Sequence, residues 1–147
     1  MTQEDKELLL KDLCARLPYR IKMNHIADDE HSPKTLIGVA KDMITLEGLG
    51  GYECVDIEDY KPYLFPLSSM TKEMIEELNA YGFFKYRDTI TNVSRLISNN
   101  GINEEIYTYI DIECISFLIE FFNSHHIDYR GLIERGLAID ATGLNIY

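Results

Sequence analysis

The spacing of apolar residues changes abruptly at Pro18, and this change constrains the fold more than any other feature of the sequence. Before Pro18, residues 3–17 carry leucines at i, i+4 and i+8 from Leu9, which is the spacing of one helix face. Thr2 is the expected N-cap of this helix. After Pro18, residues 19–26 alternate apolar and polar side chains, as a half-buried strand does. We therefore expect an N-terminal helix followed by a sheet.

Turn residues divide the next part of the chain into short segments. Further strands are predicted at residues 35–40, 43–47 and 52–57. The run Gly48-Leu49-Gly50-Gly51 lacks the lysine of a phosphate-binding loop, so it is interpreted as a turn. Pro62 and Pro66 hold the chain extended beyond the last strand. The simplest assembly is a small antiparallel meander of about four short strands, strongly twisted or barrel-like.

From about residue 71 the pattern becomes mainly helical. Helices are predicted at residues 71–82, 89–98, 113–124 and 128–136, the last one short and capped by Asp128. Residues 106–112 are β-branched and aromatic, which favours a strand, although their spacing also fits a long helix. The predicted fold class is α+β in a single domain of 1–147. Residues 1–70 form the helix and sheet, and residues 71–147 form a mainly helical half packed on it.

Charge and composition exclude several classes of protein. The 147 residues are 46% hydrophobic and 27% charged, with a net charge of −11, which is typical of a soluble globular protein. The excess of carboxylates repels phosphate backbones, so direct nucleic-acid binding is not expected. No apolar run approaches the roughly 20 residues that span a bilayer. Residues 1–6 are polar and acidic, unlike a signal peptide, so we expect a cytoplasmic protein away from membranes.

The three cysteines do not form a disulfide framework. Cys14, Cys54 and Cys114 lie far apart, their number is odd, and none belongs to a C-x-x-C pair. Cys14 and Cys114 fall on the apolar stripes of predicted helices, where a free cysteine behaves as a small hydrophobe. They are predicted to be reduced and buried.

A polar cluster follows the predicted helix 113–124 and consists of His125, His126, Asp128 and Arg130. Histidines near a helix C-terminus complement its dipole and bind its free carbonyls, so a structural role is favoured. The alternative is a metal or catalytic site. A zinc site needs three or four ligands, and adjacent histidines cannot share a helix face.

A second candidate site combines tyrosines with acids before and within the proline-containing segment. Its members are Tyr52, Tyr60, Tyr63, Glu58 and Asp59. Because tyrosine is enriched at protein interfaces, this segment is the candidate interaction surface. The alternative is that Tyr60 and Tyr63 pack the extended segment onto the sheet.

The remaining polar residues provide no catalytic constellation. Ser68 and Ser69 lack a nucleophile elbow such as G-x-S-x-G. His25 lies at the buried parity of its strand, where a hydrogen-bonded core histidine is the ordinary outcome, and the acidic run after it lacks the spacing of an EF-hand loop. We predict no catalytic residue, resident metal or cofactor.

Three segments resemble a family of small proteins that is common in gut anaerobic bacteria and their phages. They are Leu13-Cys14-Ala15-Arg16-Leu17-Pro18-Tyr19, residues 61–71 from Lys61 to Thr71, and residues 125–133 from His125 to Ile133. The resemblance implies no particular activity. With the acidic composition, it favours a non-enzymatic accessory or protein-interaction protein of phage or mobile-element origin. Such a protein would have a protein partner, and neither the resemblance nor the composition assigns an oligomeric state. The alternative function is a small metal-dependent hydrolase that uses His125, His126 and Asp128.

Overall fold

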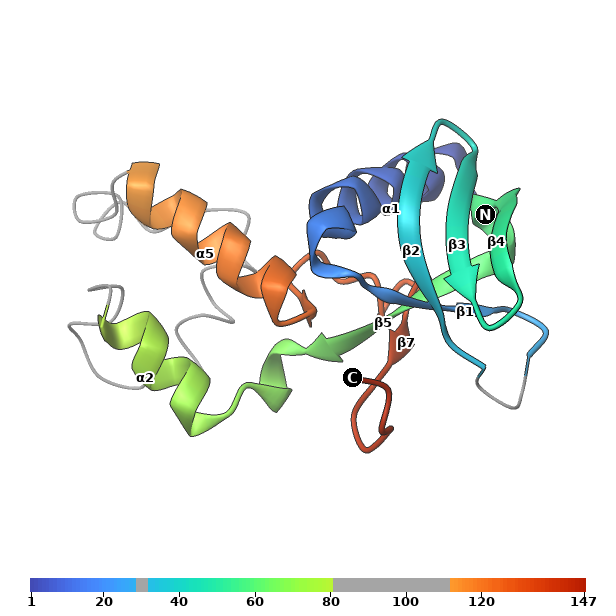
Figure 1. Ribbon diagram of the computed structural model, residues 1–147. Coiled ribbons are helices and arrows are strands. Elements are labelled where there is room, and N and C mark those ends of the chain that lie inside the picture. Colours follow the sequence, from blue (N-terminus) through green and yellow to red (C-terminus); the bar gives the residue numbers. More distant parts are fainter. Residues whose placement is uncertain (29–31, 81–111) are drawn as a thin grey trace. The chain divides into compact units, whose positions relative to one another are not determined.

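An N-terminal helix, α1 (Gln3–Arg16), opens the chain in the computed structural model, which describes residues 1–28, 32–80 and 112–147 (Figure 1). Thr2 is its N-cap, as predicted. The Thr2 hydroxyl accepts a hydrogen bond of 3.1 Å from the Asp5 N–H, and the Asp5 carboxylate accepts one of 3.4 Å from the Thr2 N–H. This reciprocal capping box satisfies two backbone donors at the helix start. A 3-10 turn, η1 (Leu17–Tyr19), follows and contains Pro18.

The buried face of α1 is rotated from the predicted one. Leu9 and Leu13 are fully buried, as expected, but Asp12 and Arg16 are fully buried beside them. Cys14 is exposed, so the prediction that it is buried was wrong. The apolar pattern misplaced the stripe because two charged residues that pair with each other occupy core positions, and hydrophobicity alone does not reveal such a pair.

The four predicted strands are all present. They are β1 (Lys22–His25), β2 (Lys34–Ala40), β3 (Met43–Gly48) and β4 (Gly51–Asp56). A 3-10 turn, η2 (Ile57–Asp59), leads into β5 (Tyr60–Pro66). Two short strands complete the sheet, β6 (Ile127–Asp128) and β7 (Ile139–Asp140).

The sheet differs from the predicted antiparallel meander. It has seven strands in the order β4-β3-β2-β1-β5-β6, with β7 also paired to β5. Strands β1 to β5 pair antiparallel, whereas β6 and β7 run parallel to β5, so the sheet is mixed. It is open and does not close as a barrel. Strands of two residues leave no alternation to detect, which is why sequence patterning missed β6 and β7.

The described residues form two compact units, and the single predicted domain stays a prediction. The first unit comprises residues 1–64 and 131–147. Leucines of α1 and apolar residues of β1, β2 and β3 form one core in it. Its buried members are Leu9, Leu13, Ile21, Met23, Leu36, Ile44, Leu46, Ile57, Tyr60, Leu64, Leu132, Leu137 and Ala138.

Residues 131–138 of the first unit pack against the N-terminal part of the chain, as predicted, but they do not form the predicted helix. Leu132 and Leu137 join the core that Leu9 and Leu13 form, as expected for this part of the chain. The chain there makes successive turns rather than a short helix over 128–136. A hydrogen bond of 2.8 Å from the Leu137 N–H to the Leu132 carbonyl closes these turns.

The second unit comprises residues 65–130, of which 81–111 lie outside the described part of the chain. It contains a 3-10 turn, η3 (Leu67–Ser69), and the helices α2 (Lys72–Ala80) and α5 (Ile112–Ser124). Its buried core members are Met70, Leu78, Phe121, Phe122 and Ile127. The predicted helix at 89–98 and the ambiguous segment 106–112 fall among residues that are not described. The turns and short strands after α5 do not support a mainly helical C-terminal half.

Candidate functional site

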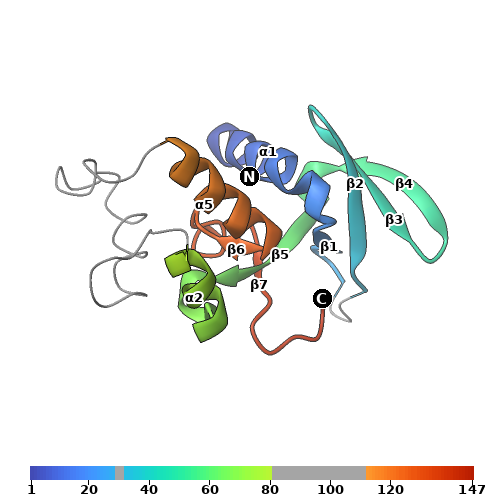
Figure 2. The same ribbon diagram turned by 60° about the vertical axis from the view of Figure 1, so that its left-hand side comes forward.

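The β3–β4 hairpin presents the most exposed large apolar side chains of the first unit. Leu49 and Gly50 connect the paired residues Gly48 and Gly51, so the turn that joins the strands has two residues. Gly51 has a φ of +110°, which favours glycine. The Leu49 side chain is fully exposed at the tip. Figure 2 shows this hairpin at the end of the twisted ribbon formed by β2, β3 and β4.

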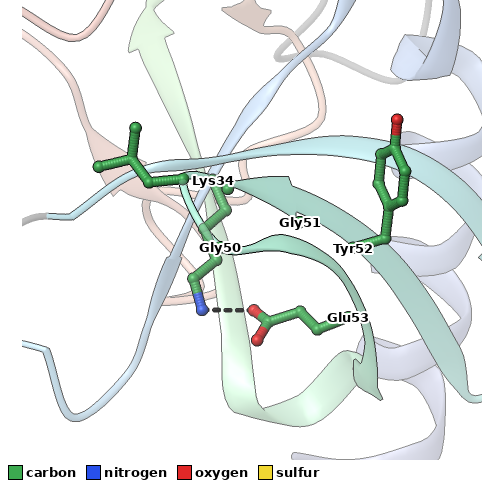
Figure 3. A pocket seen from close by; sticks show the side chains of 7 residues that line it. Lys34, Gly50, Gly51, Tyr52 and Glu53 are labelled. Atoms are coloured by element: carbon green, nitrogen blue, oxygen red, sulfur yellow. Dashed lines mark hydrogen bonds and ion pairs between the residues drawn. The ribbon is translucent and has the colours of Figure 1, made fainter.

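Neighbouring residues of β4 point to opposite faces of the hairpin. Glu53 lies opposite the buried Leu46, so its side chain is directed to the core side. Tyr52 lies opposite Glu47 on the other face and is 73% exposed. Figure 3 shows the Glu53 carboxylate directed towards Lys34 while the Tyr52 ring points away. Leu49 and Tyr52 are called the hairpin tip below.

An ionic cluster lies close to the turn of the hairpin, since Glu53 is two residues beyond Gly51. The Lys34 ammonium pairs with the Glu53 carboxylate and donates a hydrogen bond of 3.2 Å to the Tyr60 hydroxyl. That hydroxyl donates a bond of 3.1 Å to the same carboxylate oxygen of Glu53. These contacts join β2, β4 and β5 in a closed triangle, which we call the Lys34–Glu53–Tyr60 cluster.

The electrostatics of this cluster hold both charged groups in their ionised forms. The hydrogen bond from Lys34 lowers the pKa of the Glu53 carboxyl, against a smaller opposing effect of burial. The hydrogen bond to Glu53 likewise raises the pKa of the Lys34 ammonium. A lysine nucleophile needs a neutral amine and a general acid needs a protonated carboxyl, so neither chemistry is favoured here.

His25 lies beside the cluster and is hydrogen-bonded as the sequence predicted, but it is half-buried rather than in the core. Its ring meets the Tyr60 ring edge to face, with 5.1 Å between centroids. Its Nδ1 accepts a hydrogen bond of 3.1 Å from the Ala27 N–H. The half-buried ring is thus hydrogen-bonded within its own strand end. The acidic turn after it lies partly outside the described residues.

The structure divides the predicted interaction surface. Tyr60 is 4% exposed and Tyr63 is fully buried, so the alternative in which they pack the extended segment is the one observed. The segment is strand β5, which pairs on one side with β1 and on the other with β7. Tyr52, Glu58 and Asp59 remain exposed. That these three residues bind a protein stays a prediction.

A recess adjoins the hairpin tip. It is lined by Lys34, Gly48, Leu49, Gly50, Gly51, Tyr52 and Glu53 (Figure 3). Sequence reasoning treated this turn as a connection only and overlooked Leu49, Lys34 and Glu53. A large apolar residue between glycines was the available signal, because such a side chain has no neighbour in the turn that can cover it.

In the second unit, His125 completes the end of α5. Its Nδ1 lies 3.0 Å from the carbonyl oxygen of Phe121 and 3.2 Å from the Ser124 hydroxyl. Its ring packs on the Phe121 ring with 4.2 Å between centroids. The predicted role at a helix C-terminus is therefore confirmed for His125.

The other members of the polar cluster also shape the chain after α5. His126 adopts a φ of +56° and reverses the chain, and its carbonyl accepts a bond of 2.9 Å from the Phe65 N–H. The carboxylate of Asp128, in β6, accepts a bond of 3.3 Å from the Arg130 N–H rather than capping a helix. The Arg130 guanidinium lies 4.9 Å from the Tyr129 ring centroid.

Neither histidine takes part in a recognisable metal site. Across residues 1–28, 32–80 and 112–147, no three His, Cys, Asp or Glu side chains converge as metal ligands would. In the same ranges, no helix combines the length and apolar character needed to cross a bilayer.

Comparison of the chain with models of protein families, with curated proteins and with solved structures finds no match.

Proposed function

We propose that the protein is a non-enzymatic protein-interaction module and that it binds its partner through the hairpin tip. The supporting observation is the full exposure of Leu49 beside the 73% exposed Tyr52 at the end of one hairpin. Single exposed hydrophobic residues are common on protein surfaces. Leu49 in the turn and Tyr52 in β4 lie close in sequence and line the same recess, so a partner could cover both at once.

The contacts of Glu53, two residues from the turn-flanking Gly51, support this proposal because they limit the motion of the tip. The Lys34–Glu53–Tyr60 cluster ties the start of β2 and the start of β4 to β5. A contact surface that is already ordered loses less conformational entropy on binding. The tip would therefore meet a partner as a preformed surface, with tyrosine contributing amphipathic contact area.

The wider role that we propose is that of an accessory protein of a phage or mobile element in the cytoplasm. The resemblance to small proteins of gut anaerobes and their phages supports this origin. The net charge of −11 supports a protein partner over direct contact with nucleic acid. No observation on the described residues favours the hydrolase alternative, because His125 and Asp128 bond to backbone groups of their own segment.

The experiment is affinity capture from a lysate of the source organism, followed by affinity measurement with the purified partner. The variant is Leu49→Ser with Tyr52→Ser, which removes the apolar tip but leaves the Lys34–Glu53–Tyr60 cluster. The matched control is Ile37→Ser, because Ile37 is 38% exposed on β2 of the same sheet. We expect the tip variant to weaken binding about 30-fold or more, in the range of interface hot spots, and the control to change little. Equal loss in both variants would contradict the proposal.

A further inference from the structure

Strand β4 leaves a row of backbone groups open to solvent along the edge of the sheet. In a hairpin with a two-residue turn, the flanking pair exchanges both backbone hydrogen bonds, and such pairs then alternate along the strands. From the pair Gly48 and Gly51, this alternation directs the groups of Glu53 and Val55 to β3. It directs those of Tyr52 and Cys54 away from β3. Because β4 is the last strand in the sheet order, no described strand covers this side.

This edge lacks three of the features by which proteins commonly prevent strand addition, although β4 carries the acids Glu53 and Asp56. Edge strands are commonly protected by lysine, proline or a β-bulge. Residues 51–56 contain neither lysine nor proline. The register of β4 on β3 is continuous from Met43 and Asp56 to Gly48 and Gly51, whereas β2 and β3 shift register between Leu36 and Gly38. A regular open edge is the geometry that an added strand requires.

Charge selects the chemistry of the added strand. Asp56 ends β4 with an exposed side chain, and the exposed Asp59 follows three residues later. Pairing with β4 of a second copy would place like charges together and join two chains of net charge −11. A strand with basic side chains would instead meet these carboxylates favourably.

We propose that the open edge of β4 binds an extended basic segment of a partner protein by β-strand addition. Backbone hydrogen bonds to Tyr52 and Cys54 would hold the segment, and its lysine or arginine side chains would lie near Asp56. This inference rests on the proposed function and specifies the partner that the hairpin takes.

The test uses synthetic hexapeptides as probes. One alternates lysine and valine, a second alternates glutamate and valine, and a third is the basic peptide with N-methyl groups on alternate amides. Hydrogen exchange at the Tyr52 and Cys54 amides is followed by NMR with each peptide. We expect the basic peptide alone to slow exchange at both amides about ten-fold or more, because added-strand hydrogen bonds protect them.

A backbone variant then separates strand addition from other binding modes. Cys54→Pro removes an N–H that faces away from β3, a place where an edge strand tolerates proline, so the hairpin should persist. It should weaken binding of the basic peptide about ten-fold or more, whereas the control Cys54→Ala, which keeps the N–H, should change it less than about two-fold.

Several results would overturn strand addition. The first is that the basic peptide does not slow amide exchange at Tyr52 and Cys54. The second is that the acidic or N-methylated peptide slows it equally. The third is that Cys54→Pro and Cys54→Ala bind the basic peptide with equal affinity. Protection that grows with protein concentration without peptide would assign the edge to a second copy and would also overturn it. If the captured partner still depends on Leu49 and Tyr52 in these cases, the proposed function stands and only the strand-addition mode fails.

Discussion

The phenol of Tyr147 donates a hydrogen bond of 2.8 Å to the backbone carbonyl of Tyr63. The oxygen of the Tyr147 phenol also accepts a hydrogen bond of 3.3 Å from the Lys22 N–H. The register of β1 on β5 ends with Met23 opposite Pro62, and one further step would place Lys22 opposite Tyr63. The phenol therefore stands where the ladder, if continued, would link the two strands directly. The last residue of the sequence therefore bridges two central strands of the first unit, and a backbone link depends on one side chain.

Replacing Tyr147 with Phe should destabilise the protein by about 1 to 2 kcal/mol, because two backbone groups lose their shared partner. The loss is measured by urea unfolding at pH 7. Tyr52→Phe is the matched control, since the Tyr52 side chain is largely exposed, and it should leave the free energy of unfolding unchanged. Equal effects of the two substitutions would contradict the bridging role.

The Tyr147 phenol also determines how the stability of the fold should depend on pH in alkaline solution. Burial raises the pKa of its hydroxyl far above the ordinary value, although 47% of the residue's surface is exposed. A group whose pKa is higher in the folded state stabilises the fold fully below its unfolded value, about 10 for tyrosine, and less as pH rises further. The wild type should therefore lose stability above pH 10 more steeply than Tyr147→Phe. Tyrosinate absorbance during the same titration should show one fewer late-ionising tyrosine in the variant.

The buried ion pair of α1 leads to a second stability prediction. Arg16 Nε lies 2.7 Å from Asp12 Oδ2, and both side chains are fully buried. Asp12→Leu leaves the guanidinium charge in the core, so we expect a loss of about 3 to 5 kcal/mol. Adding Arg16→Met should recover most of that loss, because the two charges are then both replaced by apolar groups. Chemical denaturation of the two single variants and the double variant completes the cycle.

The control for this cycle is Lys11→Met, since Lys11 is exposed on the same helix. It should change the free energy of unfolding by less than about 0.5 kcal/mol. A double variant as unstable as Asp12→Leu would show that the pair contributes more than mutual neutralisation.

The alternating pattern predicted β1 to β4 because each of these strands has enough residues to show it. Turn chemistry also placed the β3–β4 connection correctly, since glycines flank Leu49 on both sides. The same reasoning left two alternatives for the tyrosines of β5, an interaction surface or packing of the segment onto the sheet. Whether Tyr60 and Tyr63 face solvent depends on neighbours from β1 and β7, which are distant in sequence, and local patterns do not contain that information.

The candidate site shows the same limit for polar residues. His125 could be assigned from sequence because its partner, the Phe121 carbonyl, lies one helical turn away. The Lys34–Glu53–Tyr60 cluster could not, because its members come from three strands and meet only once the sheet has formed. Local partners are thus predictable from spacing, whereas partners across a sheet require its register.

Exposed thiols give a direct check on the rotated face of α1. Cys14 and Cys54 are free and exposed, contrary to the burial expected for Cys14. Both should react with iodoacetamide in the native protein at rates close to those in denaturant. Peptide mass spectrometry after a short labelling pulse measures the modification at each site. Protection of Cys14 until unfolding would mean that α1 instead buries the face predicted from its apolar pattern.

The contribution of the Lys34–Glu53–Tyr60 cluster should be measurable in the free energy of unfolding as the pH is lowered from 7 to 3. Because the pKa of Glu53 is lowered in the folded state, its carboxylate stabilises the fold above the unfolded value, about 4.3, and this contribution is lost as pH falls further. Glu53→Gln should therefore reduce stability at pH 7 by about 0.5 kcal/mol, a small effect because the pair is partly exposed. The difference from the wild type should shrink below pH 4. Glu134→Gln is the control for an exposed carboxylate that lies outside the cluster, and urea unfolding across pH 3 to 7 compares the three proteins. A constant difference between wild type and Glu53→Gln over this range would show that the ion pair does not stabilise the turn end of the hairpin.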